Sequence, residues 1–80
     1  MYVVYILFSP SLNKYYVGST VHLSIRLEEH NRGKSTFTKK VIPWNLIHYS
    51  EYESHSEAVQ MENKIKKRGI SRYLDDINSI

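Results

Sequence analysis

The sequence contains no cysteine among its 80 residues. This absence excludes disulfide bonds and thiolate metal sites, and it fits a reducing compartment. No apolar run approaches the length that spans a membrane. The N-terminal stretch MYVVYILFSP lacks a basic segment before its apolar residues and a small-residue cleavage site. We therefore interpret it as a strand rather than a signal peptide, and we expect a cytoplasmic protein.

The chain also lacks internal repeats, low-complexity segments and linkers, and its length leaves no room for a second domain. We expect one domain over residues 1–80 with a small core and marginal stability, so that binding or oligomerisation contributes to it. The net charge of +3 is a mild basic excess. Such a charge is compatible with nucleic acid or acidic membranes and decides between neither.

Two strands are predicted at the N-terminus. Residues 2–8 (YVVYILF) are β-branched or aromatic on both faces, which is typical of a central strand covered on both sides. Residues 9–13 (SPSLN) supply turn-forming side chains, and residues 14–19 (KYYVGS) have the pattern of a second strand. The sequence therefore predicts a hairpin.

A helix is predicted from about Val21 to Asn31, with Ser19 or Thr20 as its N-cap. Gly33 suits the left-handed residue that follows a helix C-terminus. A basic, polar loop is expected next, over residues 34–40.

A strand and two helices complete the predicted fold. Pro43 marks the edge of a third strand, and Ser54 with Glu57 forms the capping-box pattern S-x-x-E before a helix that Gly69 ends. The expected strand spans residues 44–51, and the two helices span about 55–67 and 70–80. The order β-β-α-β-α-α predicts an α+β fold, in which helices flank a small three-stranded antiparallel sheet.

Arg26 and His30 are neighbours at i, i+4 on the first helix, on the shoulder of an apolar face made by Leu23 and Leu27. A cation there is costly unless it is paired or points into a cleft. The ordinary interpretation is that Arg26 extends to water or pairs with a glutamate.

Glu62 flanks an apolar stripe of the second helix and lies at i, i+4 to Lys66. An ordinary Glu–Lys helix pair explains it as well as a functional carboxylate does. Tyr5 and Tyr16 fall on neighbouring strands, where a tyrosine usually packs with its hydroxyl at the rim. Gly18 is either a strand-end glycine or a place where a ligand or another backbone comes close.

Four lysines are candidates for contact with nucleic-acid phosphates, although such charge runs are usually just solvated. They are Lys34, Lys39, Lys40 and Lys66.

The order of these residues resembles the GIY-YIG nuclease superfamily, and specifically its small single-domain members and the N-terminal domain of the bacterial excinuclease. The two signature strands appear as Val3-Val4-Tyr5 and Tyr16-Val17-Gly18. The helix arginine of the family falls on Arg26, its frequent histidine on His30, and its metal-binding glutamate on Glu62. The resemblance extends along nearly the whole chain.

The sequence departs from the family pattern in three ways. Val-Val replaces Gly-Ile in the first signature strand, and no asparagine stands near Leu74, where many members have one. We also expect no additional DNA-binding domain of the kind that gives larger relatives their affinity and sequence choice.

The resemblance implies a metal-dependent endonuclease that hydrolyses DNA phosphodiester bonds to a 3′-hydroxyl and a 5′-phosphate, with DNA repair as its context. Glu62 would hold one Mg²⁺ or Mn²⁺, and Arg26 would bind the phosphate. Tyr5 would accept the proton of the attacking water and Tyr16 would orient water or phosphate, or the two would exchange these roles. His30 would relay a proton or bind phosphate. Gly18 would leave space for the scissile strand.

The lysines would bind the DNA backbone, so non-specific or structure-selective DNA binding is expected, and RNA remains an alternative substrate. Two other functions stay open at this point. One is a nucleic-acid-binding module that keeps the fold without cleavage. The other is a structural or protein-interaction domain.

Overall fold

The computed structural model of the chain describes residues 1–32 and 44–78. The elements in this part of the chain follow the order β-β-α-β-α-α, which confirms the α+β fold. They are β1 (Tyr2–Ser9), β2 (Lys14–Thr20), α1 (Leu23–Asn31), β3 (Asn45–Tyr52), α2 (His55–Arg68) and α3 (Ile70–Asn78).

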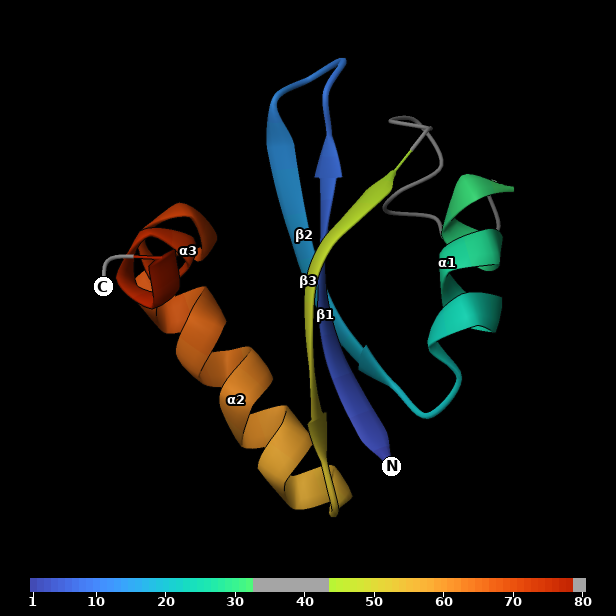
Figure 1. Cartoon of the computed structure of the whole chain (residues 1–80), viewed down its shortest axis with the longest axis vertical. Helices are drawn as coiled ribbons and strands as arrows, with labels where there is room; N and C mark the ends of the chain where they lie inside the picture. The colour runs from blue at the N-terminus through green and yellow to red at the C-terminus, as the bar shows by residue number, and fades with distance from the viewer. Residues whose placement is uncertain (33–43, 79–80) are drawn as a thin grey trace.

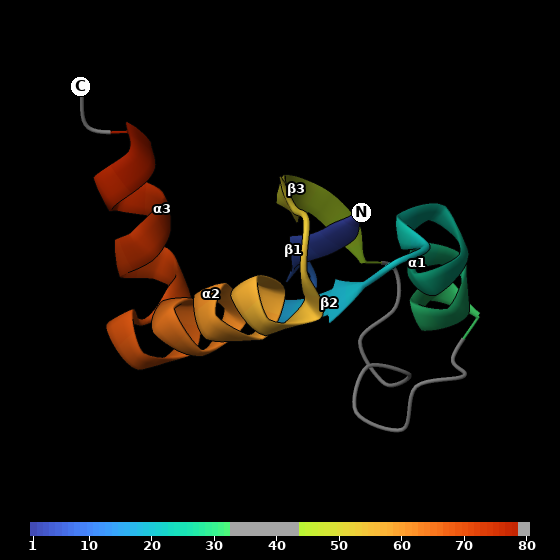
Figure 2. The same cartoon turned by 90° about the horizontal axis from the view of Figure 1, so that it is seen from below.

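The three strands form one antiparallel sheet in the order β2-β1-β3, so β1 is central as predicted. Tyr5 lies opposite Gly18 of β2 and opposite Tyr49 of β3. A register shift between Ile6 and Leu7 interrupts the pairing with β3. Helix α1 covers one face of the sheet, and α2 and α3 cover the other (Figure 1). Figure 2 shows the sheet between these two helical layers.

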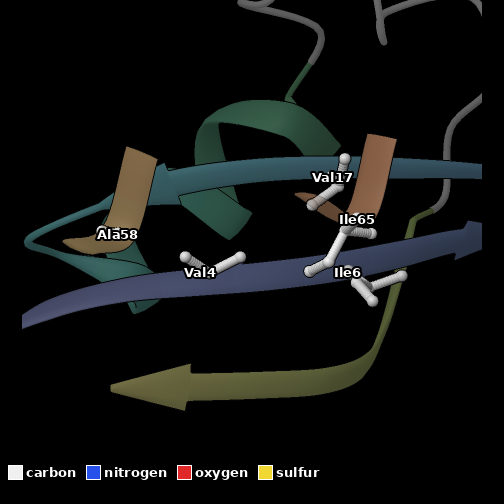
Figure 3. Close-up of a cluster of buried hydrophobic side chains, with 5 residues drawn as sticks. All are labelled: Val4, Ile6, Val17, Ala58 and Ile65. Atoms are coloured by element: carbon white, nitrogen blue, oxygen red, sulfur yellow. The ribbon is translucent and has the colours of Figure 1, made fainter. Parts of the chain in front are cut away.

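The face toward α2 and α3 buries an aliphatic core. Alternate residues of β1 point to this side, because successive side chains of a strand face opposite ways. Figure 3 shows the cluster, whose members come from β1, β2 and α2: Val4, Ile6, Val17, Ala58 and Ile65. Half-buried residues of α3 pack against its margin.

The face toward α1 buries a second cluster that contains Tyr5, Leu7 and Trp44. Leu23 and Leu27 of α1 pack against it. Trp44 is therefore a core residue, and the candidate site grows out of this aromatic layer.

The ends of α2 follow the predicted signals. The Ser54 hydroxyl accepts a hydrogen bond from the Glu57 backbone N–H at 3.2 Å and donates one to the Glu57 carboxylate at 3.0 Å. Gly69 ends the helix with a φ of 94°, a conformation that favours glycine.

The predicted N-cap of α1 is wrong. The helix begins at Leu23 after His22, whose side chain makes no capping hydrogen bond. Ser19 stays in the sheet opposite Val4, and the Thr20 hydroxyl accepts a hydrogen bond from the His22 N–H at 3.2 Å within the turn. Neither hydroxyl therefore caps the helix, which begins at Leu23. The predictions for Gly33, the loop 34–40 and Pro43 lie outside the described residues.

Candidate active site at the edge of strand β2

Tyr5 and His30 form a buried polar pair between the sheet and α1. The phenol is 1% exposed and the imidazole 0% exposed. The Tyr5 Oη lies 3.0 Å from the His30 Nε2, which is hydrogen-bonding distance. β1 supplies the phenol, and the last turn of α1 brings the imidazole onto it.

Tyr16 joins this pair from β2. Its ring centroid lies 5.0 Å from that of His30 and 6.3 Å from that of Tyr5, and it also contacts Trp44 edge-on at 6.1 Å. The side chain of Tyr16 is half-buried, so its ring lies between the buried pair and solvent. The structure thus brings together the two tyrosines and the histidine that the sequence singled out.

Gly18 makes room for the Tyr5 phenol. A Cβ at this position would lie 2.6 Å from the Tyr5 Oη and 3.2 Å from the Tyr16 Cε2. The first distance is far inside van der Waals contact, and the phenol is packed and cannot move freely. The close approach that glycine permits at position 18 is therefore the approach of Tyr5.

Arg26 borders the cluster on its solvent side. Its side chain is 36% exposed, and its Nη1 lies 3.2 Å from Glu29 Oε1. A hydrogen bond with Tyr5 is the main cause that raises the pKa of the guanidinium. The pairing with a glutamate matches the ordinary interpretation of this residue, while Tyr5 is close enough to raise the pKa of the guanidinium.

The environment keeps both members of the buried pair neutral near neutral pH. Burial raises the pKa of Tyr5 to about 12, although the hydrogen bond from Arg26 works in the opposite direction. Burial, followed by the nearby charge of Arg26, lowers the pKa of His30, and Glu29 opposes this decrease. Both groups are therefore neutral, with the Tyr5 hydroxyl and the His30 Nε2 at hydrogen-bonding distance.

Glu62 does not lie in this cluster, because α2 lies on the other face of the sheet. Its carboxylate is half-buried, with 18% of the side chain exposed. Ser19 donates a hydrogen bond to Oε1 at 2.9 Å, and Lys66 Nζ lies 2.8 Å from Oε2. The predicted Glu62–Lys66 helix pair is thus present, with a serine of β2 as a third member.

The Tyr5 phenol and the Glu62 carboxylate lie on opposite sides of the edge strand β2. Gly18, over which the Tyr5 hydroxyl lies, is followed directly by Ser19, which holds Glu62. Consecutive strand residues face opposite sides, so the phenol and the carboxylate flank the same short segment of β2. Glu62 is also close enough to contribute, after burial and Tyr16, to the raised pKa of Tyr5. Among residues 1–32 and 44–78, β2 is the edge strand of the sheet and no strand pairs with its outer side.

Glu62 offers one carboxylate as a possible metal ligand. The described residues contain no group of three or more histidine, cysteine, aspartate or glutamate side chains that could enclose a metal ion. Mg²⁺ is commonly held by one or two carboxylates while it keeps several waters and binds substrate phosphates. The residues present fit that mode of binding, with Lys66 as the cation that a metal ion would have to displace from Oε2.

Three of the four predicted phosphate-binding lysines, Lys34, Lys39 and Lys40, lie outside the described residues. Lys66 lies beside Glu62 instead of standing free. Sequence reasoning missed Ser19, and its only signal was its place directly after Gly18. It also missed Asn31, whose amide exchanges two hydrogen bonds with the Trp44 backbone, at 2.6 and 3.2 Å. These bonds fix the start of β3 against the end of α1.

Among residues 1–32 and 44–78, no helix is both long and apolar enough to cross a membrane.

Comparison with known proteins assigns the family. The model of the GIY-YIG catalytic domain matches residues 1–73. The chain belongs to the GIY-YIG family. This agrees with the resemblance carried by Tyr5, Tyr16 and Gly18.

Similar curated proteins are the UPF0213 proteins of three bacteria. Those of Listeria welshimeri, Syntrophus aciditrophicus and Staphylococcus aureus are 39%, 41% and 38% identical over 56, 54 and 52 residues. The alignments cover 69%, 65% and 64% of this chain and 62%, 62% and 63% of the relatives. The matched region thus spans less than two thirds of their length. No solved structure matches the chain.

GIY-YIG nucleases generally use a divalent metal ion.

Proposed function

We propose that this protein is a cytoplasmic, metal-dependent endonuclease that hydrolyses phosphodiester bonds in DNA, and that the reaction takes place at the Gly18–Ser19 edge of β2. The observation that carries the proposal is the buried Tyr5–His30 hydrogen bond, which Arg26 and Tyr16 border. A core could fill this space with leucine, so the buried polar pair calls for a chemical explanation.

Arg26 is the phosphate-binding group in this proposal. Its planar guanidinium can donate two parallel hydrogen bonds to phosphate oxygens, a geometry that lysine does not copy. The ion pair with Glu29 is half-exposed and therefore weak, so a phosphate can compete for the guanidinium.

Tyr5 and His30 form the proton path. A phenol with a pKa of about 12 is a poor base on its own at neutral pH. With His30 in the tautomer that leaves Nε2 unprotonated, Tyr5 passes its proton to Nε2 as it accepts one from the attacking water, and the imidazole becomes an imidazolium. The more exposed Tyr16 then orients the water or the phosphate. The reverse assignment of the two tyrosines predicts that Tyr16→Phe causes the larger loss of rate.

Glu62 holds the metal ion in this proposal, and Ser19 fixes the direction of its carboxylate. When bound, Mg²⁺ or Mn²⁺ supplies charge neutralisation at the phosphate and assistance to the leaving oxygen. Without the metal ion, the Glu62 carboxylate forms an ion pair with Lys66. In this proposal, the side chains of Lys34, Lys39 and Lys40 bind phosphates of the DNA backbone.

The second candidate is a nucleic-acid-binding module without cleavage activity. Two observations favour it. Lys66 already neutralises Glu62, the proposed metal ligand, and burial raises the pKa of Tyr5 away from the range of an effective base.

The test incubates purified protein with supercoiled plasmid, single-stranded DNA and branched DNA in Mg²⁺, Mn²⁺ or EDTA. We expect metal-dependent nicking that Glu62→Gln reduces at least 100-fold, whereas the matched control Glu51→Gln, an exposed carboxylate on β3, retains it. Nicking that survives Glu62→Gln contradicts the assigned site. Binding without cleavage in every metal supports the second candidate.

A further inference from the structure

A groove lies along the outer edge of β2, where α2 meets α3. Its volume is about 480 Å³, and it is lined by Tyr15, Tyr16, Val17, Lys66 and Ile70. Tyr15 and Val17 alternate with Tyr16 on the strand, so the groove opens mainly toward the α2 and α3 side. Tyr15, Val17 and Ile70 of this lining have no role in the proposed cleavage reaction.

The groove continues directly from the candidate site. Tyr16 belongs to both, and Lys66 lines the groove while its ammonium contacts Glu62. From Glu62 to Lys66 is one helical turn, a rise of about 6 Å. The distance from Ser19 to Val17, two strand residues, is about 7 Å. The groove therefore lies within about 7 Å along the edge strand of Ser19, which binds the proposed metal-binding carboxylate.

The lining suits a nucleotide. Tyr15 is 36% exposed, and its ring is held by Phe8 at a centroid distance of 5.0 Å. A ring that is fixed on one side and open on the other is a stacking platform, and base–aromatic stacking tolerates any sequence. Ile70 adds apolar surface, and Lys66 offers a cation to a backbone phosphate.

The volume of the groove is within the range of about 300–1,000 Å³ that is typical of small-molecule sites, so one nucleotide fits in it. A base stacks on the Tyr15 ring only when its own face is exposed. The stacked occupant must therefore present an unpaired base.

We propose that the groove binds one unpaired nucleotide of the substrate strand next to the phosphate that is cleaved, with its base on Tyr15 and a flanking phosphate at Lys66. The substrate is then single-stranded DNA, or a branched or frayed DNA with an unpaired base at this position. The position of the nucleotide relative to the cleaved bond rests on the proposed function, whereas its binding does not.

The test measures binding in EDTA, so that cleavage plays no part. Fluorescently labelled single-stranded DNA and a blunt duplex of the same sequence are titrated with wild-type protein, Tyr15→Ala and Tyr15→Phe. We expect tighter binding of the single strand, a loss of about tenfold or more for Tyr15→Ala on that strand only, and retention by Tyr15→Phe. A 2-aminopurine base in the single strand should be quenched by wild-type protein and not by Tyr15→Ala.

Tyr49→Ala is the matched control, since Tyr49 is a 53% exposed tyrosine on the opposite edge strand. It should leave single-strand binding unchanged, and thermal melting checks that both alanine variants are folded. Equal losses on single strand and duplex, no loss at all, or the same loss in Tyr49→Ala would each overturn the proposal.

The two proposals fail in distinguishable ways. If no substrate is cleaved in any metal while Tyr15 still governs single-strand binding, the nuclease proposal fails and the groove proposal stands. If duplex and single strand are cleaved equally and Tyr15→Ala changes neither, the groove proposal fails and the nuclease proposal stands.

Discussion

The two faces of the sheet bury different kinds of side chain, although the same strand supplies both. Toward α2 and α3, β1 places Val4 and Ile6 in an aliphatic cluster. Toward α1, it places Tyr5 beside His30, with the hydroxyl of Ser9 also fully buried on that side. Alternation along one strand therefore separates a stabilising layer from a polar layer.

On the face toward α1, the buried polar groups need hydrogen-bond partners within the protein. A buried hydroxyl or imidazole loses its water and must be hydrogen-bonded within the protein. In the part of the chain that the structure describes, no buried side-chain nitrogen or oxygen lacks a partner. The α1 layer thus tolerates polar groups, while the α2 and α3 layer gains stability from apolar burial. Substitutions on the two faces should therefore have different consequences.

The largest effect on stability is expected from Ile65→Ala. Ile65 is 1% exposed in the aliphatic cluster, and removal of a large aliphatic side chain from a core costs about 2–5 kcal/mol. In a domain of this size such a loss is a large part of the total stability. Urea denaturation measures the change, with the exposed Ile47→Ala as the control. A loss below about 1 kcal/mol would remove the distinction between the two layers.

Gly18→Ala should damage both stability and the candidate site. The added methyl would lie 2.6 Å from the Tyr5 Oη, so the phenol must shift away from His30. We expect a loss of about 1–3 kcal/mol together with loss of cleavage. Urea denaturation measures the loss of stability, and the plasmid nicking assay measures the loss of cleavage. Gly18→Ala in a Tyr5→Phe background tests the cause, since removal of the hydroxyl should relieve part of the clash.

Tyr5→Phe should separate chemistry from stability. The change keeps the buried ring but removes the hydroxyl that bonds the buried His30 Nε2, so the free energy of unfolding should fall by about 1–3 kcal/mol. Cleavage should fall at least 100-fold if the phenol carries a proton in the reaction. Tyr49→Phe provides the comparison at an exposed tyrosine. Full activity in Tyr5→Phe would reduce the polar pair to a structural feature.

The smallest effect concerns pH. Because the pKa of His30 lies below its usual 6.5 in the folded protein, the unfolded chain binds its proton first as the pH falls. The stability that comes from neutral His30 is complete above pH 6.5 and is lost progressively below it. Urea midpoints between about pH 7.5 and 5 should show this decline, and His30→Gln should make it shallower. The exposed His22→Gln should keep the wild-type slope.

The fold was predictable because its signals are local. The apolar run of β1, the Ser54–Glu57 cap and Gly69 each specify a strand or a helix end from a few neighbouring residues. The α1 start was not predictable in the same way. The Ser19 hydroxyl had two possible partners, and the one it takes, Glu62, is 43 residues away in sequence.

The candidate site was predictable only as a set of residue types in the order of a family. Spacing on α1 indicates that Arg26 and His30 are neighbours, but it says nothing about the phenol that reaches the imidazole. Neither the burial that raises the pKa of Tyr5 nor the arrangement of Glu62 on the opposite face follows from periodicity. Both depend on how separate elements pack.

The central position of β1 has a consequence for how the molecule assembles. β1 pairs on one side with β2, through a short hairpin. On its other side it pairs with β3, where Tyr2 lies opposite Tyr52. During synthesis the hairpin is complete long before this distant partner emerges from the ribosome. In that interval an apolar strand has one open side, and such a side readily recruits other nascent chains. Slower, cooler expression should therefore raise the yield of native protein.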